Sequence, residues 1–479
     1  MAMTEQSAVT MVEIGEMSLD RFATVLDPGL LTELEGGILL ARSLFAGRAI
    51  WNVNSTARGG GVAEMLATLL AYARGIGVDT RWAVIEGNEQ FFAITKRIHN
   101  RLHGYPGDGG PLGAAERAVY EATLAPSARA FTGMIGAGDV VILHDPQTAG
   151  LIPALRSLGV PVVWRCHVGV DAPNRLAHET WAFLAPYVSQ ADATVFSRQS
   201  FAWDVLEDVR HSIITPTIDA FSSKNELLDE PTVHSILVAA GLRAGPVDGA
   251  PPAFTRRDGT VGQVKRKAKV IEERPLQHHD HYVLQVSRWD SLKDPMGVIR
   301  GFSDHIAPYT DAHLVYAGPA ADDVADDPEA TAVLNEVLSH LDELTPDARS
   351  RIHLAMLPLT DDEENAAMVN ALQRGATVVI QKSLAEGFGL TVAEAMWKAR
   401  PVVASRIGGI QDQIEDGVSG TLLNDPTDTA EYGAAVTSLL LDADTAATMG
   451  AAAQERIRAH FLGPKSLLAY LYLLERLLV

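Results

Sequence analysis

The sequence predicts an α/β protein with two doubly wound domains that face each other across a cleft. Two observations carry this prediction: the chain has 479 residues, and short apolar runs alternate with helical stretches in two separate series. A single hydrophobic core rarely extends over so many residues, so two domains of roughly 200 residues each are expected. Apolar β-branched runs separated by helices are typical of βαβ units around a parallel sheet.

The first series begins near residue 49. Its predicted strands are AIWNVN (49–54), TRWAVIE (80–86), VVILHD (140–145), VPVVWRCH (160–167), ATVFS (193–197) and HSIITP (211–216). Helices are predicted from Val62, over 89–102 and near 178–190. These elements form a predicted N-terminal domain over residues 1–220.

The stretch from 217 to 281 interrupts the alternation. It contains the loose segment GPVDGAPPAFTRRDG (245–259) and the basic segment VKRKAK (264–269). Clusters of Gly and Pro mark turns and loops, so we predict a domain junction with an insertion or a mobile loop. Runs of like charge are usually solvated, which favours a surface segment over a ligand site at 264–269.

The second series begins at residue 281 and forms a predicted C-terminal domain over 221–463. Its strands are HYVLQVSR (281–288), HLVYAG (313–318), RIHLAML (351–357), TVVIQK (377–382), PVVAS (401–405) and GTLL (420–423). Its helices lie near 295–306, 328–341 and 390–398, and two more helices follow at about 443–461 and 464–478. In such sheets ligands bind at the carboxyl ends of the strands.

Composition limits the classes of function. The formal net charge of −21 argues against nucleic acid and anionic membranes as partners, because both attract basic proteins. The single cysteine, Cys166, excludes an internal disulfide and a cysteine-cluster metal site. The N-terminal segment lacks the pattern of a secretory signal, and no apolar run reaches the ~20 residues that span a bilayer. A soluble cytoplasmic protein is expected.

The first motif that carries chemistry is NSTARGGGVAEML (54–66), where a strand leads through three glycines into a helix. Glycines allow the backbone to approach an anion, and a helix N-terminus offers unpaired N–H groups. Gly60 and Gly61 are therefore candidate phosphate contacts. The alternative is a glycine turn needed only for packing. The motif is not G-x-G-x-x-G, which weakens a nicotinamide-dependent dehydrogenase as an alternative.

The second motif is QVSRWDSLKDP (285–295). Arg288 ends a strand, Lys293 follows five residues later, and Pro295 suits the first turn of a helix. Two cations at a strand end in a very acidic chain are placed to bind a diphosphate. The alternative is an ordinary charged strand end at the surface.

The third motif is KSLAEGFGLTVAEAMWKARPVVAS (382–405). Glu386 precedes a GFG turn and can accept hydrogen bonds from sugar hydroxyls, whereas Glu394 lies two turns into a helix and can bind a ribose. The N–H groups of Phe388, Gly389 and Leu390 can face phosphate or sugar. Two glutamates at this spacing are usually solvated. The GFG turn and the apolar helix make this the most specific signal in the chain.

Four polar residues follow strands of the first domain, where they can orient sugar hydroxyls. They are His144, Asp145, His167 and Asp171. A histidine that ends a buried strand is as often structural as functional. The aspartates of ADDVADDPEA (321–330) resemble a metal cluster, but a solvated approach to a helix is favoured, and no metal site is predicted.

At these residues the chain resembles the retaining GT-B glycosyltransferases related to sucrose-phosphate synthase and glycogen synthase. The E-x7-E element is Glu386 to Glu394, and the Arg/Lys pair is Arg288 and Lys293. Five segments resemble the group of trehalose glycosyltransferring synthase and trehalose phosphorylase: NVNSTARGGGVAEML, RCHVGVD, QVSRWDSLKDP, VNALQRGATVVIQKSLAEGFGLTVAEAMWK and RIGGIQDQI. These segments span about residues 49 to 425.

The resemblance implies a GT-B fold of two Rossmann-like domains, with the last helix (464–479) returning to the first. It implies reversible, retaining transfer of glucose from a nucleoside diphosphate glucose to glucose, which gives α,α-trehalose without an essential metal or cofactor. Arg288 and Lys293 would hold the diphosphate, Glu394 the ribose and Glu386 the donor sugar. Gly61 would contact phosphate, and His144, Asp145 and His167 would face the sugars. The segment 245–280 is longer than the group leads one to expect.

Several alternative functions fit the same residues. A phosphorylase would use inorganic phosphate at the same cations, and a retaining transferase could use another sugar acceptor. A sugar-nucleotide sensor without turnover is a non-enzyme alternative, which the complete set of four charged residues disfavours. The expected partners are a nucleotide sugar and a small sugar acceptor. Nothing in the sequence sets the oligomeric state, so a homodimer is left open.

Overall fold

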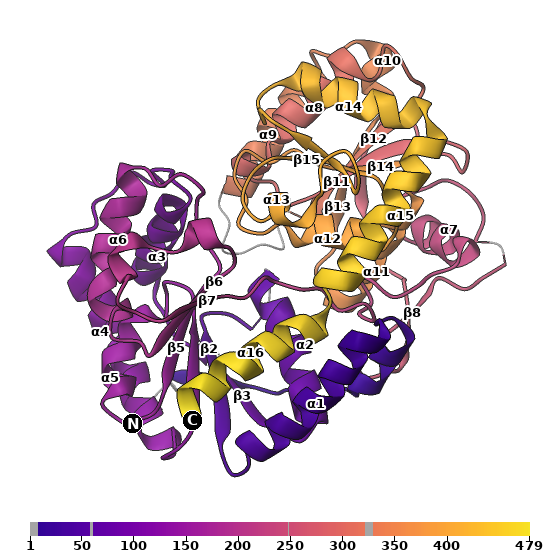
Figure 1. Cartoon of the computed structure of the whole chain (residues 1–479). Coiled ribbons are helices and arrows are strands. Elements are labelled where there is room, and N and C mark those ends of the chain that lie inside the picture. The colour runs from indigo at the N-terminus through magenta and orange to yellow at the C-terminus, as the bar shows by residue number, and fades with distance from the viewer. Residues whose placement is uncertain (1–7, 58–60, 248, 321–328) are drawn as a thin grey trace, which may run out of the picture. The chain divides into compact units, whose positions relative to one another are not determined.

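The computed structural model describes residues 8–57, 61–247, 249–320 and 329–479. The chain divides into two compact units (Figure 1). Unit 1 comprises Met1–Thr217 with Gly463–Val479, and unit 2 comprises Ile218–Leu462. These boundaries lie within three residues of those predicted from the sequence, 220/221 and 463/464.

Unit 1 contains a seven-stranded sheet in the order β1-β3-β2-β4-β5-β6-β7. Its strands are β1 (Val9–Val12), β2 (Ala49–Asn54), β3 (Asp79–Ile85), β4 (Val140–His144), β5 (Val162–Cys166), β6 (Ala193–Phe196) and β7 (His211–Ile213). Edge strand β1 is antiparallel to β3, and the other neighbours are parallel. Because β3 lies on one side of β2 and β4 on the other, the chain changes direction at β2 and β4.

Helices cover both faces of this sheet (Figure 1). They are α1 (Pro28–Leu44), α2 (Gly61–Gly75), α3 (Glu89–Leu102), α4 (Ala114–Met134), α5 (Ile152–Arg156), α6 (Arg175–Val188) and α16 (Gly463–Leu478). One core lies beneath α3 to α6. A second core joins Leu30 of α1 and Leu471 of α16 to Ile142 and Val163 of the sheet. The C-terminal helix therefore packs on unit 1, as predicted.

Unit 2 contains a seven-stranded sheet in the order β10-β13-β12-β11-β14-β15-β16. Its strands are β10 (Lys269–Ile271), β11 (Tyr282–Val286), β12 (His313–Pro319), β13 (Ile352–Leu357), β14 (Val378–Gln381), β15 (Val402–Ser405) and β16 (Thr421–Leu423). Only the edge pair β10–β13 is antiparallel among the described pairs of this sheet. The parallel strands have the order 3-2-1-4-5-6, which defines the doubly wound fold.

The helices of unit 2 bury an apolar core against this sheet. They are α7 (Glu230–Ala239), α8 (Pro295–His305), α9 (Glu329–Leu341), α10 (Pro346–Arg349), α11 (Asp362–Gly375), α12 (Leu390–Trp397), α13 (Ile410–Gln413), α14 (Thr429–Leu441) and α15 (Ala443–His460). The predicted strands and helices of the second series are confirmed, with ends that differ by a few residues.

The segment 217–281 differs from its prediction as a junction with an insertion or a mobile loop. The boundary lies at its start, and the rest belongs to unit 2. It forms α7, the hairpin of β8 (Ala253–Thr255) and β9 (Val261–Gln263), and edge strand β10. The Gly/Pro pattern marked turns correctly, but tertiary ion pairs order the chain between them.

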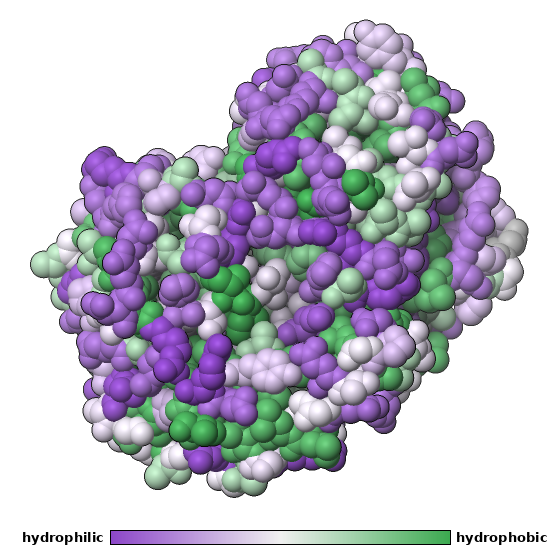
Figure 2. Space-filling view, in the orientation of Figure 1, coloured by the Kyte–Doolittle hydropathy of each residue, from purple (hydrophilic) through white to green (hydrophobic). Residues whose placement is uncertain are grey.

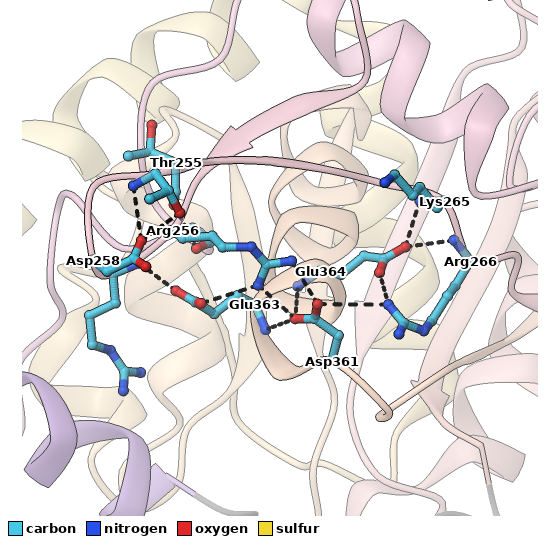
Figure 3. A network of polar contacts seen from close by, with 11 residues as sticks. Thr255, Arg256, Asp258, Lys265, Arg266, Asp361, Glu363 and Glu364 are labelled. Carbon is cyan, nitrogen blue, oxygen red and sulfur yellow. Dashed lines mark hydrogen bonds and ion pairs between the residues drawn. The ribbon is translucent and has the colours of Figure 1, made fainter. Parts of the chain in front are cut away.

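Those ion pairs join the hairpin region to the N-terminus of α11 (Figure 3). Arg256 donates to both carboxylate oxygens of Asp361, at 3.1 and 2.7 Å, and lies 3.3 Å from Glu363. Arg266 pairs with Glu364, a side chain that is 3% exposed. The segment 264–269 lies at the surface, as predicted, but its Arg266 is 43% exposed and also pairs with a buried carboxylate.

No helix of the described residues is long and apolar enough to cross a membrane. Polar residues cover much of the face seen in Figure 2.

Candidate active site

The two charged motifs of unit 2 meet where the direction of its sheet changes. β11 has β12 on one side and β14 on the other. Arg288 and Lys293 follow β11, and Glu386 follows β14. The carboxyl ends of adjacent parallel strands at such a point form the crevice in which doubly wound sheets bind ligands.

Lys293 and Glu386 contact each other directly. The Lys293 Nζ lies 2.7 Å from the Glu386 Oε2, and the two side chains are 16% and 13% exposed. Glu386 Oε2 also accepts a weak hydrogen bond from the Ser383 hydroxyl at 3.4 Å. Backbone contact holds the two loops together, because Leu384 N donates to Leu292 O at 2.8 Å. The structure thus places Lys293, which is predicted to bind the diphosphate, beside Glu386, which is predicted to bind the donor sugar.

Arg288 borders the same loop and is more accessible. Its side chain is 48% exposed, and its Nη2 lies 3.3 Å from Asp290 Oδ2. Asp290 also caps the short helix Ser291–Lys293 by accepting from Leu292 N at 2.8 Å. The next residue, Trp289, is fully buried and fixes the loop to the core. A rigid loop therefore carries a guanidinium whose side chain reaches solvent.

A second ion pair at this edge was not predicted. Lys382, which is 1% exposed, pairs with Asp294. Asp294 has a left-handed backbone (φ 50°) and caps α8 by accepting from Gly297 N at 3.0 Å. The one available signal was a lysine at the end of the apolar strand TVVIQK. A buried pair of this kind fixes the loops on either side of Lys293 and Glu386.

The GFG turn is held by the RIGG segment beside it. Gly389 has φ 78° and precedes α12, whose first turn has no capping side chain among the described residues. Gly408 has φ 48°, and a Cβ there would lie 2.1 Å from Glu386 O. Gln413 Nε2 donates to Phe388 O at 2.5 Å. Val392 N donates to Gly389 O at 3.0 Å, and no described side chain caps the start of α12 at Leu390, which suits anion binding.

Glu394 lies deeper, in α12, and is 4% exposed. Its Oε1 lies 3.7 Å from Lys224 Nζ, and its backbone carbonyl accepts from Lys398 Nζ at 3.0 Å. Lys224 precedes α7 in a segment whose sequence gave no sign of a partner. Glu394, which is predicted to bind the ribose, is therefore a buried carboxylate beside a lysine.

In unit 1, His144 and His167 form a stacked pair. His144 Nδ1 lies 3.2 Å from His167 Nε2, and the rings are 5.5 Å apart at 17°. His144 Nε2 lies 3.0 Å from Asn52 Oδ1 on the neighbouring strand β2. Because an amide oxygen only accepts, His144 carries its proton on Nε2 and accepts from His167 at Nδ1. Burial lowers the pKa of His144 to about 3 and that of His167 well below its usual value, and the charge of Arg165 adds to both effects.

Asp145 is locked beside this pair. Its backbone is left-handed (φ 65°), and its Oδ1 accepts from His167 N at 2.8 Å. Burial raises its pKa to about 6, against the opposing effects of that N–H group and of the Arg165 charge. A non-glycine residue in this conformation and a shifted carboxyl pKa are both frequent at functional sites.

The remaining predicted residues of unit 1 have different environments. Asp171 is exposed and pairs with Arg198 at 2.6 Å, and it accepts from Ser200 Oγ at 2.8 Å, so its carboxylate serves the loop before α6. Gly61 begins α2 after β2, as predicted. Gly60 lies outside the described residues, as do Asp322, Asp323, Asp326 and Asp327.

Comparison with known proteins gives two family matches. Residues 52–203 match the model described as "Trehalose synthase, N-terminal domain", and residues 267–456 match "Glycosyl transferases group 1". The chain is 35% identical over 452 residues to a trehalose synthase of Rubrobacter xylanophilus, covering 94% of each chain. It is 27% identical to a trehalose phosphorylase of Pleurotus sajor-caju, over 77% of this chain and 50% of that protein.

Solved structures share the fold at low identity. A sucrose-phosphate synthase from Thermosynechococcus elongatus superimposes with a TM-score of 0.62 at 18% identity, covering 90% of this chain and 99% of that one. A chain of two doubly wound units thus has the fold of the GT-B glycosyltransferases.

Proposed function

The chain belongs to the trehalose synthase family of GT-B glycosyltransferases, and we propose that it makes α,α-trehalose by moving glucose from a nucleoside diphosphate glucose to glucose. The observation that carries the proposal is the contact between Lys293 and Glu386 at the switch point of unit 2. Wherever a sugar–diphosphate bond is cleaved, a side chain that binds the diphosphate must lie next to a side chain that binds the sugar. The family match through both units supports trehalose as the product.

The donor site is assigned to unit 2. Arg288 and Lys293 bind the diphosphate, and the uncapped first turn of α12 adds N–H groups. Glu386 accepts hydrogen bonds from the glucosyl hydroxyls. Glu394, buried beside Lys224, binds the ribose hydroxyls. Two carboxylates at different depths suit a ligand with a sugar at each end of a diphosphate.

The reaction proceeds with retention by displacement on one face of the sugar. The bond from the glucosyl C1 to the diphosphate oxygen breaks, and the acceptor hydroxyl oxygen bonds to C1 from the same side. The hydroxyl proton passes to a phosphate oxygen of the leaving group. Negative charge builds on the diphosphate in the transition state, so preorganised cations and N–H groups are the largest catalytic contribution.

The acceptor side is assigned to unit 1. In the His144–His167 pair, His167 donates from Nε2 to His144, so its Nδ1 carries no proton and can accept a hydrogen bond. Asp145 supplies a carboxylate beside it. Both groups accept hydrogen bonds, which suits the hydroxyl donors of a second glucose. Gly61, at the start of α2, would lie on the phosphate side.

We also propose that the reaction needs no essential metal. Arg288 and Lys293 provide the positive charge that a metal would supply to a diphosphate. Within the described ranges, no group of three or more His, Cys, Asp or Glu side chains is arranged to hold a metal ion. Activity is therefore expected to survive exhaustive treatment with EDTA. Loss of activity that magnesium or manganese restores would contradict this part.

A phosphorylase is the second candidate, because Arg288 and Lys293 could also bind inorganic phosphate. The relative of that name is matched over half its own length and at lower identity, which favours the synthase. A sensor without turnover is disfavoured by the complete set of charged residues at the site.

The proposal is tested by incubating the protein with nucleoside diphosphate glucoses that differ in base, with glucose as acceptor. The expected product is α,α-trehalose, identified by NMR and by cleavage with trehalase. A parallel reaction contains trehalose with phosphate or with nucleoside diphosphate. Glucose 1-phosphate formed only with phosphate would show a phosphorylase, and transfer to other sugars alone would overturn the acceptor.

A further inference from the structure

A buried arginine lies next to the histidine pair and has no part in the function proposed above. Arg165 on β5 is in register with His144 on β4, so both side chains project from the same face of the sheet. Each is 1% exposed. Asn52 on β2 and Ser197 after β6 are buried polar neighbours on this face. Together they form a polar row across the carboxyl ends of four strands, beneath α16.

The environment of Arg165 lacks the usual partners of a buried guanidinium. Its Nη2 reaches the Ser197 hydroxyl at 3.5 Å, and its Cζ lies 5.9 Å from the centre of the Tyr470 ring of α16. Its Nε and Nη1 have no hydrogen bond to any described residue. A buried charge without an ion pair is costly, so a purely structural role does not explain it.

The surroundings also make this charge effective over several ångströms. A cavity of about 100 Å³ lies beneath α1, α2 and α16, and apolar side chains line most of it. Asn52, His144 and Tyr470 border its polar end. Apolar walls screen a charge poorly, so the guanidinium acts on each titratable group that faces it. Burial has the larger effect on the pKa of five nearby groups, and the Arg165 charge acts to lower the pKa of each: Asp145, His144, Cys166, His167 and Tyr470.

The hydrogen bonds on the side assigned to the acceptor sugar require an ionised Asp145 and neutral His144 and His167 rings. Asp145 accepts from His167 N, and His144 accepts from His167 Nε2 while it donates to Asn52. A proton on His144 Nδ1 would face the His167 N–H and force that ring to shift its own proton to Nδ1. His167 Nδ1 would then no longer accept. A proton on Asp145 would remove a second acceptor.

We propose that Arg165 is a positioning residue for the acceptor sugar: its buried charge keeps Asp145 ionised and the His144–His167 pair neutral, so that both accept hydrogen bonds from sugar hydroxyls. The inference rests on the proposed function, because it assigns the acceptor to this face of unit 1. Arg165 itself does not touch the sugar. The contact with Tyr470 also makes this charge state depend on the seating of α16.

The test compares Arg165→Met, which keeps the length of the side chain, with Arg165→Lys, which keeps the charge. The pH dependence of kcat/KM for the acceptor is measured for each. In Arg165→Met the acid limb moves to higher pH by about one unit, and Arg165→Lys restores most of the shift. The matched control is Arg117→Met, because Arg117 also packs on aromatic rings in unit 1 and its guanidinium contacts Phe183 and Tyr187 instead.

A second measurement does not depend on activity. The histidine ring signals are followed by NMR from pH 8 down to the lowest pH at which the protein stays folded, with His144→Gln and His167→Gln used for assignment. Burial is the larger cause of the low pKa of both rings and the Arg165 charge adds to it, so in Arg165→Met both rings should gain their proton at a higher pH than in the wild type. Unchanged ring titration and an unchanged acid limb in folded Arg165→Met would overturn the proposal. Absence of trehalose in the wild type, with the ring titration as expected, would instead contradict the proposed function alone.

Discussion

Lys293 and Glu386, on loops that follow two adjacent strands, form an ion pair of 2.7 Å that is about 85% shielded from solvent. The cation assigned to the diphosphate and the carboxylate assigned to the glucosyl group therefore neutralise each other. When the donor binds, the ion pair has to separate, so that Lys293 contacts the diphosphate and Glu386 contacts the glucosyl group. The pair also keeps each side chain in place before the donor arrives, which reduces the cost of reorganisation.

This contact predicts that Lys293→Ala and Glu386→Gln each lower kcat by about 100-fold or more. The double variant should lose less than the product of the two effects, because each substitution already removes the shared contact. Steady-state kinetics of the four proteins give the coupling. Lys267→Ala, an exposed lysine of the same unit, is the control. Multiplicative losses would show that the two side chains act independently.

Arg288→Ala should lower kcat by about 100-fold or more while the melting temperature stays nearly unchanged. The side chain is 48% exposed, so its loss costs little folding free energy, whereas its proposed partner gains charge in the transition state. Arg300→Ala removes another exposed arginine, on α8, and serves as the control. A normal kcat in folded Arg288→Ala would remove this residue from the site.

The raised pKa of Asp145 predicts an acid limit to activity. The carboxylate protonates as the pH falls through about 6, so kcat/KM for the acceptor should decline below that pH. Above it the group is ionised and the rate should be level. Asp145→Asn should be slow at every pH and should lack this limb. A limb that persists in Asp145→Asn would have to come from another group.

The ion pairs of Figure 3 predict a local effect of Arg256→Ala. Amide hydrogen exchange over β8 and β9 should become roughly five-fold faster, for a loss of about 1 kcal/mol in a partly exposed network. Arg257→Ala is the matched control, since only the backbone of Arg257 contacts Glu363. Equal exchange in both variants would mean that the hairpin is ordered by other contacts.

The same network has a defined dependence on pH. Hydrogen bonding from Arg256 is the main reason that the pKa of Asp361 falls from 3.8 to about 2. Its stabilising contribution is therefore complete above pH 4 and is lost as the pH falls from 4 towards 2.

The sequence predicted the strands that carry the site because buried parallel strands are apolar runs. Those runs lead directly into Arg288 and His144, and into the loop that contains Glu386. It could not predict which loops meet. Lys382 and Asp294 are 88 residues apart, and only the strand order brings them together. β10 was missed because it has three residues and lies in a charged segment, so periodicity gave no signal. The spacing of Asp171 from His167 gave no sign of its ion pair with Arg198, which follows a different strand.

The assignment of α16 to unit 1 has a consequence for synthesis on the ribosome. The face of the first sheet that contains Ile142 and Val163 is covered by leucines of α16, which are translated after all of unit 2. At roughly 5–20 residues per second, the 218–462 stretch takes about 10–50 s to translate. During that interval unit 2 can complete its fold, whereas unit 1 exposes an apolar face. The unit that is made first is therefore the one that finishes last, and nascent chains should depend on chaperones that bind apolar surface until the final helix emerges.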